Sequence, residues 1–66
     1  MKTIVQSKLI KSIYYQADSR ALDVNFHNGK TRVYYEVPAD TVNNLLSSTS
    51  PGWYYNCHIK GSYPEQ

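Results

Sequence analysis

Several features that would define a class of protein are scarce or missing in this sequence. Its 66 residues include one cysteine, Cys57, so no disulfide can form within the chain. No stretch approaches the roughly 18 consecutive apolar residues of a membrane-spanning helix. The opening MKTIVQSKLIK has no apolar run long enough for a signal peptide. We therefore expect a cytoplasmic protein without a membrane partner, folded as one domain over residues 1–66, with residues 1–7 as a loose leader.

The patterns of catalytic and metal sites are missing too. His27, Cys57 and His58 lack the paired ligand spacing of a zinc site. The sequence has no GxSxG motif and no paired carboxylates. Residues 28–31, Asn-Gly-Lys-Thr, look like the end of a phosphate-binding loop but lack its upstream glycine and its following helix. We expect no enzyme activity, no metal and no cofactor.

Tyrosine is the residue that stands out. The chain carries seven tyrosines and a net charge of only +2, which is well short of the dense basic stripe of a strong duplex binder. Six of them form the pairs Tyr14-Tyr15, Tyr34-Tyr35 and Tyr54-Tyr55. Neighbouring residues of a strand point to opposite faces, so each strand pair should place one ring in the core and one outside.

A hairpin is predicted over residues 22–37, LDVNFHNGKTRVYYEV. Asn28-Gly29 between two alternating apolar runs favours a two-residue turn. That register places Arg32 opposite Asn25 and Tyr34 opposite Asp23. The predicted core face is then Leu22, Val24, Phe26, Thr31, Val33, Tyr35 and Val37. The predicted outer face is Asp23, Asn25, His27, Lys30, Arg32, Tyr34 and Glu36.

The remaining segments complete an α+β fold. Residues 8–16 predict a first strand with a bulge or a late start near Lys11, and residues 17–20 a polar turn. Apolar residues at helical spacing predict a helix from about residue 38 to residue 48. Ser50 followed by Pro51 predicts a cap and first turn of a second helix that continues through His58. The expected architecture is a three-stranded antiparallel β-meander followed by two short C-terminal helices packed on one face.

The outer sheet face is the main candidate binding site. Arg32, Tyr34, Lys30, Asn25 and Tyr14 would share it, and small domains use such faces to stack unpaired bases and hold phosphates. Trp53, at the start of the second helix, is a separate candidate for stacking, close to free backbone N–H groups. The alternatives are structural: cross-strand pairs of tyrosine and arginine stabilise the sheet, or the second helix covers them, and Trp53 packs beside an ordinary helix cap.

The sequence resembles the KTSC domain, a short module also found at the C-terminus of some lysyl-tRNA synthetases. The resemblance runs from about residue 7 to residue 63. It rests on Ser7-x-x-Ile10-x-x-Ile13-x-Tyr15, Leu22-x-Val24-x-Phe26, Asn28-Gly29, Val37-Pro38, Leu45-Leu46 and Ser50-x-Gly52-x-Tyr54-Tyr55-Asn56-x-x-Ile59-x-Gly61-x-Tyr63. The family usually has Tyr-x-Tyr in the third strand, whereas this chain has Arg32 and then Tyr34.

The resemblance implies no settled activity. Its tRNA-synthetase context suggests RNA binding, and related modules in phage-like genomes suggest a host-interacting or a sequestering role. From the sequence we expect a non-enzymatic module that binds RNA or single-stranded nucleic acid. Two alternatives stay open: a homo-oligomer that sequesters a nucleotide-type small molecule, and a protein–protein interaction module.

Overall fold

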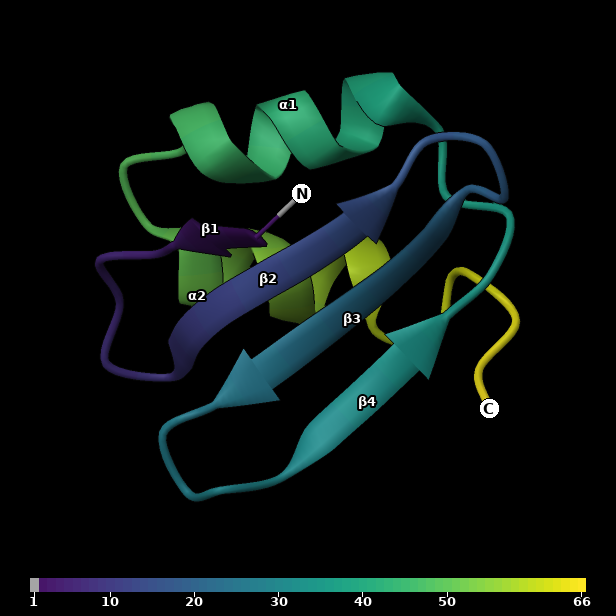
Figure 1. The fold of residues 1–66 in the computed structure, drawn as a ribbon. Helices are drawn as coiled ribbons and strands as arrows, with labels where there is room; N and C mark the ends of the chain where they lie inside the picture. Colours follow the sequence, from purple (N-terminus) through teal and green to yellow (C-terminus); the bar gives the residue numbers. More distant parts are fainter. Residues whose placement is uncertain (1) are drawn as a thin grey trace.

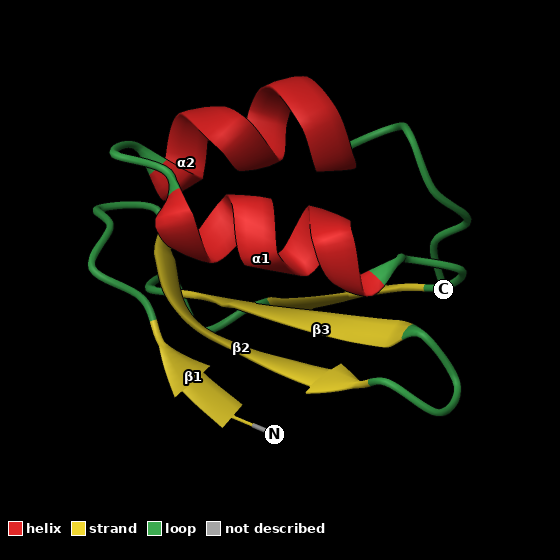
Figure 2. Cartoon of the chain, turned by 90° about the horizontal axis from the view of Figure 1, so that it is seen from above, coloured by secondary structure: helices red, strands yellow, loops and turns green. Residues whose placement is uncertain are grey.

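The fold is a four-stranded antiparallel sheet with a helical layer on one face (Figures 1 and 2). The structure is a computed structural model, which describes residues 2–66. The strands are β1 (Lys2–Ile4), β2 (Ile10–Gln16), β3 (Ala21–Phe26) and β4 (Thr31–Tyr34), and they lie in sequence order across the sheet. The helical layer consists of α1 (Ala39–Ser47), α2 (Pro51–Tyr54) and the π-helical turn η1 (Tyr55–Ile59).

The predicted α+β class and the two helices on one face are confirmed, but the strand count was wrong. Part of the segment predicted as a loose leader forms β1, which pairs antiparallel with β2 through Lys2 opposite Tyr14 and Ile4 opposite Ser12. Met1, also part of the predicted leader, lies outside the described residues. A strand of three residues is too short for an alternating pattern to reveal it, and β1 depends on backbone bonds to the edge of β2.

The irregularity predicted near Lys11 is confirmed. The pairing of β2 with β3 shifts between Ile10 and Ser12. An extra residue on one strand changes which face the following side chains reach. Ile10 and Ile13, three positions apart, are therefore both completely buried on the helix-covered face.

The predicted register of the central hairpin was wrong by one residue. In the structure Leu22 pairs with Tyr34 and Val24 with Arg32, whereas the prediction paired Leu22 with Tyr35. A shift of one residue moves every side chain of a strand to the other face. Tyr34 is accordingly completely buried on the core face, and Tyr35 is 40% exposed.

The loop is longer than predicted because His27 joins it. The Gly29 N–H donates to the Phe26 carbonyl (3.1 Å), and the Phe26 N–H donates to the Lys30 carbonyl (2.9 Å). With Gly29 at φ +87°, this is the three-residue hairpin loop that ends in a left-handed glycine. The His27 N–H donates to the Leu9 carbonyl (3.2 Å), and His27 Nε2 lies 2.9 Å from the Ser7 carbonyl oxygen. These contacts with a distant segment hold His27 out of the strand pairing.

The helices cover one sheet face largely as expected. Val42 and Leu45 of α1 are buried, as are Tyr55 and Ile59. The second helix was predicted to run through His58, but after Tyr54 it widens into a π-helical turn, in which the Lys60 N–H donates to the Tyr55 carbonyl (2.9 Å). A glycine just after a helix favours a left-handed cap, and Gly61 adopts that conformation, with φ +80°.

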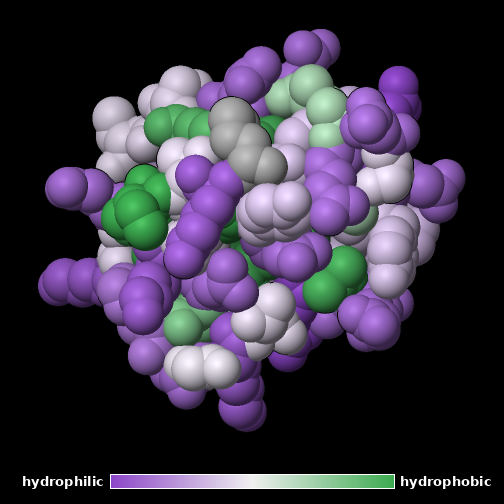
Figure 3. All heavy atoms as spheres, in the orientation of Figure 1, coloured by the Kyte–Doolittle hydropathy of each residue, from purple (hydrophilic) through white to green (hydrophobic). Residues whose placement is uncertain are grey.

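One core lies between the sheet and the helical layer. Its members are Val5, Ile10, Ile13, Tyr15, Leu22, Val24, Phe26, Tyr34, Val37, Val42, Leu45, Tyr55 and Ile59. The opposite sheet face is not covered by a helix, and it carries mostly hydrophilic and intermediate side chains with apolar ones in separate small patches (Figures 2 and 3). We call it the open face.

The C-terminal segment lies along β4. The Tyr35 N–H donates to the Pro64 carbonyl (2.8 Å), and the Gln66 N–H donates to the Val33 carbonyl (2.9 Å). Between these bonds Glu65 pairs with Tyr34 as an isolated antiparallel bridge. The segment therefore fixes Glu65 beside the last residues of β4.

Candidate anion-binding pocket

A small pocket lies between the tip of the β3–β4 hairpin and η1. It has a volume of about 200 Å³. The hairpin and the segment before β2 contribute one side, and η1 with the residue that follows it contributes the other. The lining residues are Leu9, Phe26, Asn28, Lys30, Arg32, Tyr55, Asn56 and Lys60. Residues from three distant segments of the chain thus meet around one hollow, which we call the basic pocket.

Three of the lining side chains are cations. Lys30 and Arg32 come from the hairpin, and Lys60 follows η1. All three residues are exposed at the surface. Because the loop places Arg32 on the same face as Val24, its side chain extends toward the helical layer, where Lys60 also lines the pocket. The two-residue turn predicted from the sequence would have directed Arg32 to the open face instead.

Glu65 is the acidic partner of Arg32. One carboxylate oxygen lies 3.1 Å from Arg32 Nη1, and the two side chains are 34% and 47% exposed. The Glu65 charge is the main cause that raises the pKa of Arg32, followed by Tyr55 and Tyr34. An ion pair this exposed contributes little to stability, because water and salt screen it. A stronger anion can therefore compete with Glu65 for the guanidinium at little cost in stability.

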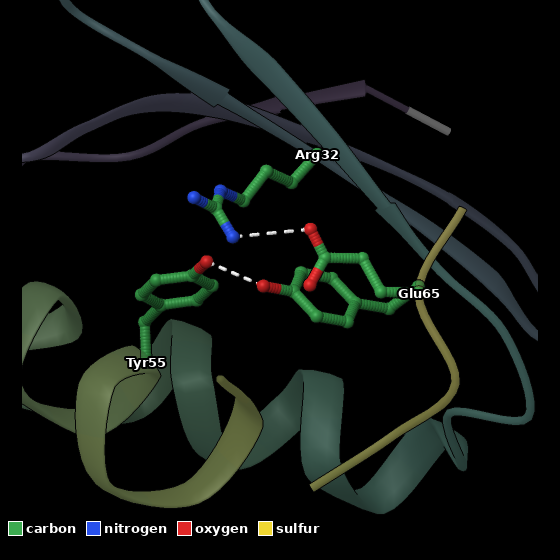
Figure 4. Close-up of polar contacts among 4 residues, drawn as sticks. Arg32, Tyr55 and Glu65 are labelled. Atoms are coloured by element: carbon green, nitrogen blue, oxygen red, sulfur yellow. Dashed lines mark hydrogen bonds and ion pairs between the residues drawn. The ribbon is translucent and has the colours of Figure 1, made fainter. Parts of the chain in front are cut away.

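Two buried tyrosines meet beneath Arg32. The hydroxyl oxygens of Tyr34, on β4, and Tyr55, at the start of η1, are 2.5 Å apart (Figure 4). Their rings are packed edge to face, with centroids 6.0 Å apart. Burial, and then the hydrogen bond to Tyr34, raise the pKa of Tyr55. Tyr55 is therefore a neutral phenol at physiological pH, and its hydroxyl can donate a hydrogen bond.

The structure separates the six residues predicted as a site into four places. Lys30 and Arg32 lie together in the basic pocket. Tyr34 lies beneath it, fully buried. A base cannot reach the ring of Tyr34 there, so its predicted exposure on an outer face was wrong.

Asn25 and Tyr14 lie on the open face, across the sheet from the pocket. Asn25 is tied into a row of side chains, since its Nδ2 donates to Ser12 Oγ (3.2 Å) and its Oδ1 accepts from Thr31 Oγ1 (2.8 Å). These bonds give Asn25 a role in stabilising the pairing of neighbouring strands. Tyr14, on the next row, is 38% exposed.

Trp53 is exposed on α2. Its side chain is 61% exposed, so it is not the packed tryptophan of the alternative interpretation. Its ring contacts His58 edge to face, at 6.0 Å between centroids, and the tilted ring of Tyr54 also contacts His58, at 4.6 Å between centroids. Ser50 occupies the predicted cap position, but its side chain makes no capping hydrogen bond.

Sequence reasoning missed Tyr55, Asn56 and Lys60 as pocket residues. The sequence alone indicates helix packing for Tyr55, a loop hydrogen bond for Asn56 and a favourable charge near a helix end for Lys60. The missing information was the π-helical turn, which is closed by the Lys60 N–H and the Tyr55 carbonyl. No local residue pattern indicates such a turn. The charge of Lys60 close to the helical layer was the only signal available.

Residues 2–66 lack two kinds of feature. They contain no cluster of three or more histidine, cysteine, aspartate or glutamate side chains that could hold a metal ion. None of their helices has the length and apolar character needed to cross a membrane. Cys57 is exposed as a free thiol.

Known proteins resemble the chain over nearly its whole length. Residues 6–63 match the family model of the KTSC domain. A protein of Tsukamurella paurometabola is 34% identical over 56 residues, which cover 85% of this chain and 84% of the relative. The crystal structure of a KTSC domain protein from Yersinia pestis has a TM-score of 0.94 and 32% identity, covering 100% of this chain and 93% of that one. The chain therefore belongs to the KTSC domain family.

Proposed function

We propose that this domain is a non-enzymatic module that binds RNA or single-stranded nucleic acid by holding phosphate in the basic pocket. The observation that supports the proposal is the meeting of Lys30, Arg32 and Lys60 around one hollow. Phosphate contacts by lysine and arginine supply most of the affinity of nonspecific nucleic-acid binding. The proposal keeps Lys30 and Arg32 from the sequence-based site and replaces Tyr34 with Lys60.

The pocket suits binding better than catalysis. Its polar groups are three cations, two amides and one neutral phenol, together with Glu65 at its edge. Glu65 is engaged with Arg32 and paired with β4, so it is not placed to act as a base. Cations and hydrogen-bond donors on fixed backbone elements hold an anion without changing it.

Trp53 supports the choice of a nucleic-acid strand as ligand. It lies three positions before Asn56, which lines the pocket, and residues three apart on a helix are surface neighbours. A strand whose phosphate occupies the pocket can therefore stack a base on the exposed indole. Such stacking contributes about 1–3 kcal/mol per base.

The pocket volume bears on the nucleotide-sequestering alternative. A volume of about 200 Å³ is below the roughly 300–1,000 Å³ of sites that enclose a small molecule. The basic pocket of one subunit can therefore hold a phosphate group but not surround a whole nucleotide. Sequestration by an oligomer and binding of a protein partner remain predictions from the sequence.

Fluorescence anisotropy with a labelled single-stranded RNA, at two salt concentrations, tests the proposal. The variant Lys30→Ala/Lys60→Ala removes two charges from the pocket, and Lys2→Ala/Lys11→Ala removes two charges elsewhere. Lys2 lies on the open face with Tyr14, so the control also tests the site predicted from the sequence.

We expect the pocket variant to bind more weakly and with a shallower salt dependence. Each phosphate contact in a single strand contributes about 0.7 to the slope of log affinity against log salt. Loss of two contacts should therefore lower the slope by about 1.4. The proposal fails if the wild type does not bind, or if Lys2→Ala/Lys11→Ala reduces binding more than the pocket variant does.

A further inference from the structure

We infer that the basic pocket recognises a terminal phosphate, a phosphomonoester at the end of a strand or on a nucleotide, in preference to the phosphodiesters within a strand. The inference rests on the proposed function and names the ligand group that this site selects. Its first support is charge. Lys30, Arg32 and Lys60 with Glu65 leave an excess of two positive charges at the pocket. A phosphomonoester carries about −1.5 to −2 at neutral pH, whereas a phosphodiester carries only one negative charge.

The second support is the shape of the pocket. Its inner wall is formed by Phe26 and Tyr55, which are 8% and 2% exposed and belong to the core. A phosphate within a strand must let the chain leave on two sides. A terminal phosphate is bonded to the chain on one side only. Its free oxygens can therefore face the inner wall of the pocket while the chain leaves toward solvent.

The third support is the hydrogen-bonding of the two phenols. One hydroxyl hydrogen is used between Tyr34 and Tyr55, whose oxygens are 2.5 Å apart. When Tyr34 is the donor of that bond, the Tyr55 hydrogen is left for another acceptor, and Tyr55 lines the pocket. The Tyr55 hydroxyl can then donate a hydrogen bond to the ligand.

A phosphomonoester can use this arrangement fully. It has three oxygens that are not bonded to carbon, enough for the guanidinium, an ammonium group and the Tyr55 hydroxyl to contact separate atoms. A diester has only two such oxygens. On binding, the phosphate would displace Glu65 from Arg32, an exposed contact of small net stability.

The experiment compares short RNA probes of one sequence that differ only at the 5′ end. One ends in phosphate, one in methyl phosphate and one in hydroxyl, with the fluorophore at the 3′ end of each. The methyl ester keeps the phosphorus but has one negative charge and no third free oxygen. We expect the phosphate probe to bind about tenfold more tightly than the other two, as one added charge-assisted hydrogen bond allows.

Tyr55→Phe and Tyr34→Phe form a matched pair of variants. Both remove one hydroxyl of the same buried pair, but only Tyr55 lines the pocket. We expect Tyr55→Phe to reduce the phosphate-to-hydroxyl affinity ratio severalfold and Tyr34→Phe to change it less. Lys60→Gln should also reduce the phosphate-to-hydroxyl affinity ratio, and it does not alter the core because Lys60 is exposed. Lys11→Gln, which removes an exposed lysine outside the pocket, is its control.

Competition separates the sources of the phosphate. Displacement of the phosphate probe by adenosine monophosphate as strongly as by an unlabelled strand would assign the site to free nucleotides, and weaker displacement would assign it to strand ends. Adenosine, which lacks the phosphate, and inorganic phosphate, which lacks the nucleoside, serve as two further competitors.

The result that overturns the inference is equal, salt-dependent binding of all three probes, reduced by Lys30→Ala/Lys60→Ala. In that case the proposed function stands and the preference for a terminal phosphate does not. Loss of binding by every probe would overturn the proposed function as well.

Discussion

Replacement of Tyr34 and of Tyr35, one at a time, tests the register on which the pocket depends. The two residues are identical and adjacent, but Tyr34 is 0% exposed and Tyr35 is 40% exposed. Truncation of a large buried ring to alanine costs about 3–5 kcal/mol. That equals the roughly 3–5 kcal/mol that a single core of this size supplies. We therefore expect Tyr34→Ala to be unfolded at room temperature and Tyr35→Ala to lose about 0.5 kcal/mol or less.

Milder substitutions make the comparison quantitative. Tyr34→Phe keeps the ring and its edge-to-face contact with Tyr55 but removes the hydroxyl bond. It should cost about 1 kcal/mol. Urea unfolding followed by far-ultraviolet circular dichroism gives these free energies without depending on Trp53, which is exposed. A larger loss in Tyr35→Ala than in Tyr34→Ala would refute the register and place Arg32 on the open face.

Three further predictions concern the loop, the ion pair and alkaline pH. Gly29→Ala should lower the free energy of unfolding in urea by about 1–2 kcal/mol, because Gly29 has φ +87°, a conformation that strains any residue with a Cβ atom. The new methyl group would clash with no neighbouring atom, so an unchanged urea midpoint would contradict the left-handed loop. Glu65→Gln should leave stability within about 1 kcal/mol and tighten phosphate binding in the anisotropy assay, since Arg32 loses its competing anion; weaker binding would contradict this. Burial raises the pKa of Tyr55 above the usual 10.0, so the folded state resists its ionisation. The contribution of neutral Tyr55 to the free energy of unfolding should be complete below pH 10 and should fall as the pH rises above 10. Urea midpoints measured across this pH range should fall less steeply in Tyr55→Phe than in the wild type; identical profiles would refute the prediction.

The parts of the fold that depend on local pattern were predictable. The first helix was expected at residues 38–48 and is found at Ala39–Ser47. Its apolar residues recur at helical spacing because that face packs on the sheet. The bulge near Lys11 and the left-handed Gly61 were equally visible, since each follows from the conformational limits of particular residues.

The missing strand and the hairpin register depend on contacts between distant segments. β1 exists because β2 offers an unpaired edge, and nothing within residues 2–4 alone specifies it. Asn28-Gly29 fits a two-residue turn and a three-residue loop alike, because both use a glycine with positive φ. The choice between them is made by His27, which bonds to Ser7 and Leu9. Those bonds form only once residues 7–9 lie beside the hairpin.

Only part of the candidate site was predictable, because its remaining residues also depend on contacts between distant segments. Lys30 and Arg32 could be chosen from the sequence because their charge is useful wherever the strand places them. Their partner Lys60 could not, since the register that directs Arg32 toward η1 was not evident. Tyr34 was misassigned with the register. Asn25, also a candidate, is held by side-chain bonds to Ser12 and Thr31 across the open face.

One extra residue in the hairpin loop therefore decides on which side of the sheet this domain can bind an anion. With a two-residue turn, Arg32 would point to the open face, away from Lys60 and from the hydroxyl pair. With the observed three-residue loop, Arg32 pairs across from Val24 and reaches over Tyr34 and Tyr55 to the edge of the core. The same shift that buries Tyr34 creates a phenol pair with a cation above it. The helix-covered face of β4 thus contributes Tyr34 to the core and Arg32 to the charged wall of the pocket.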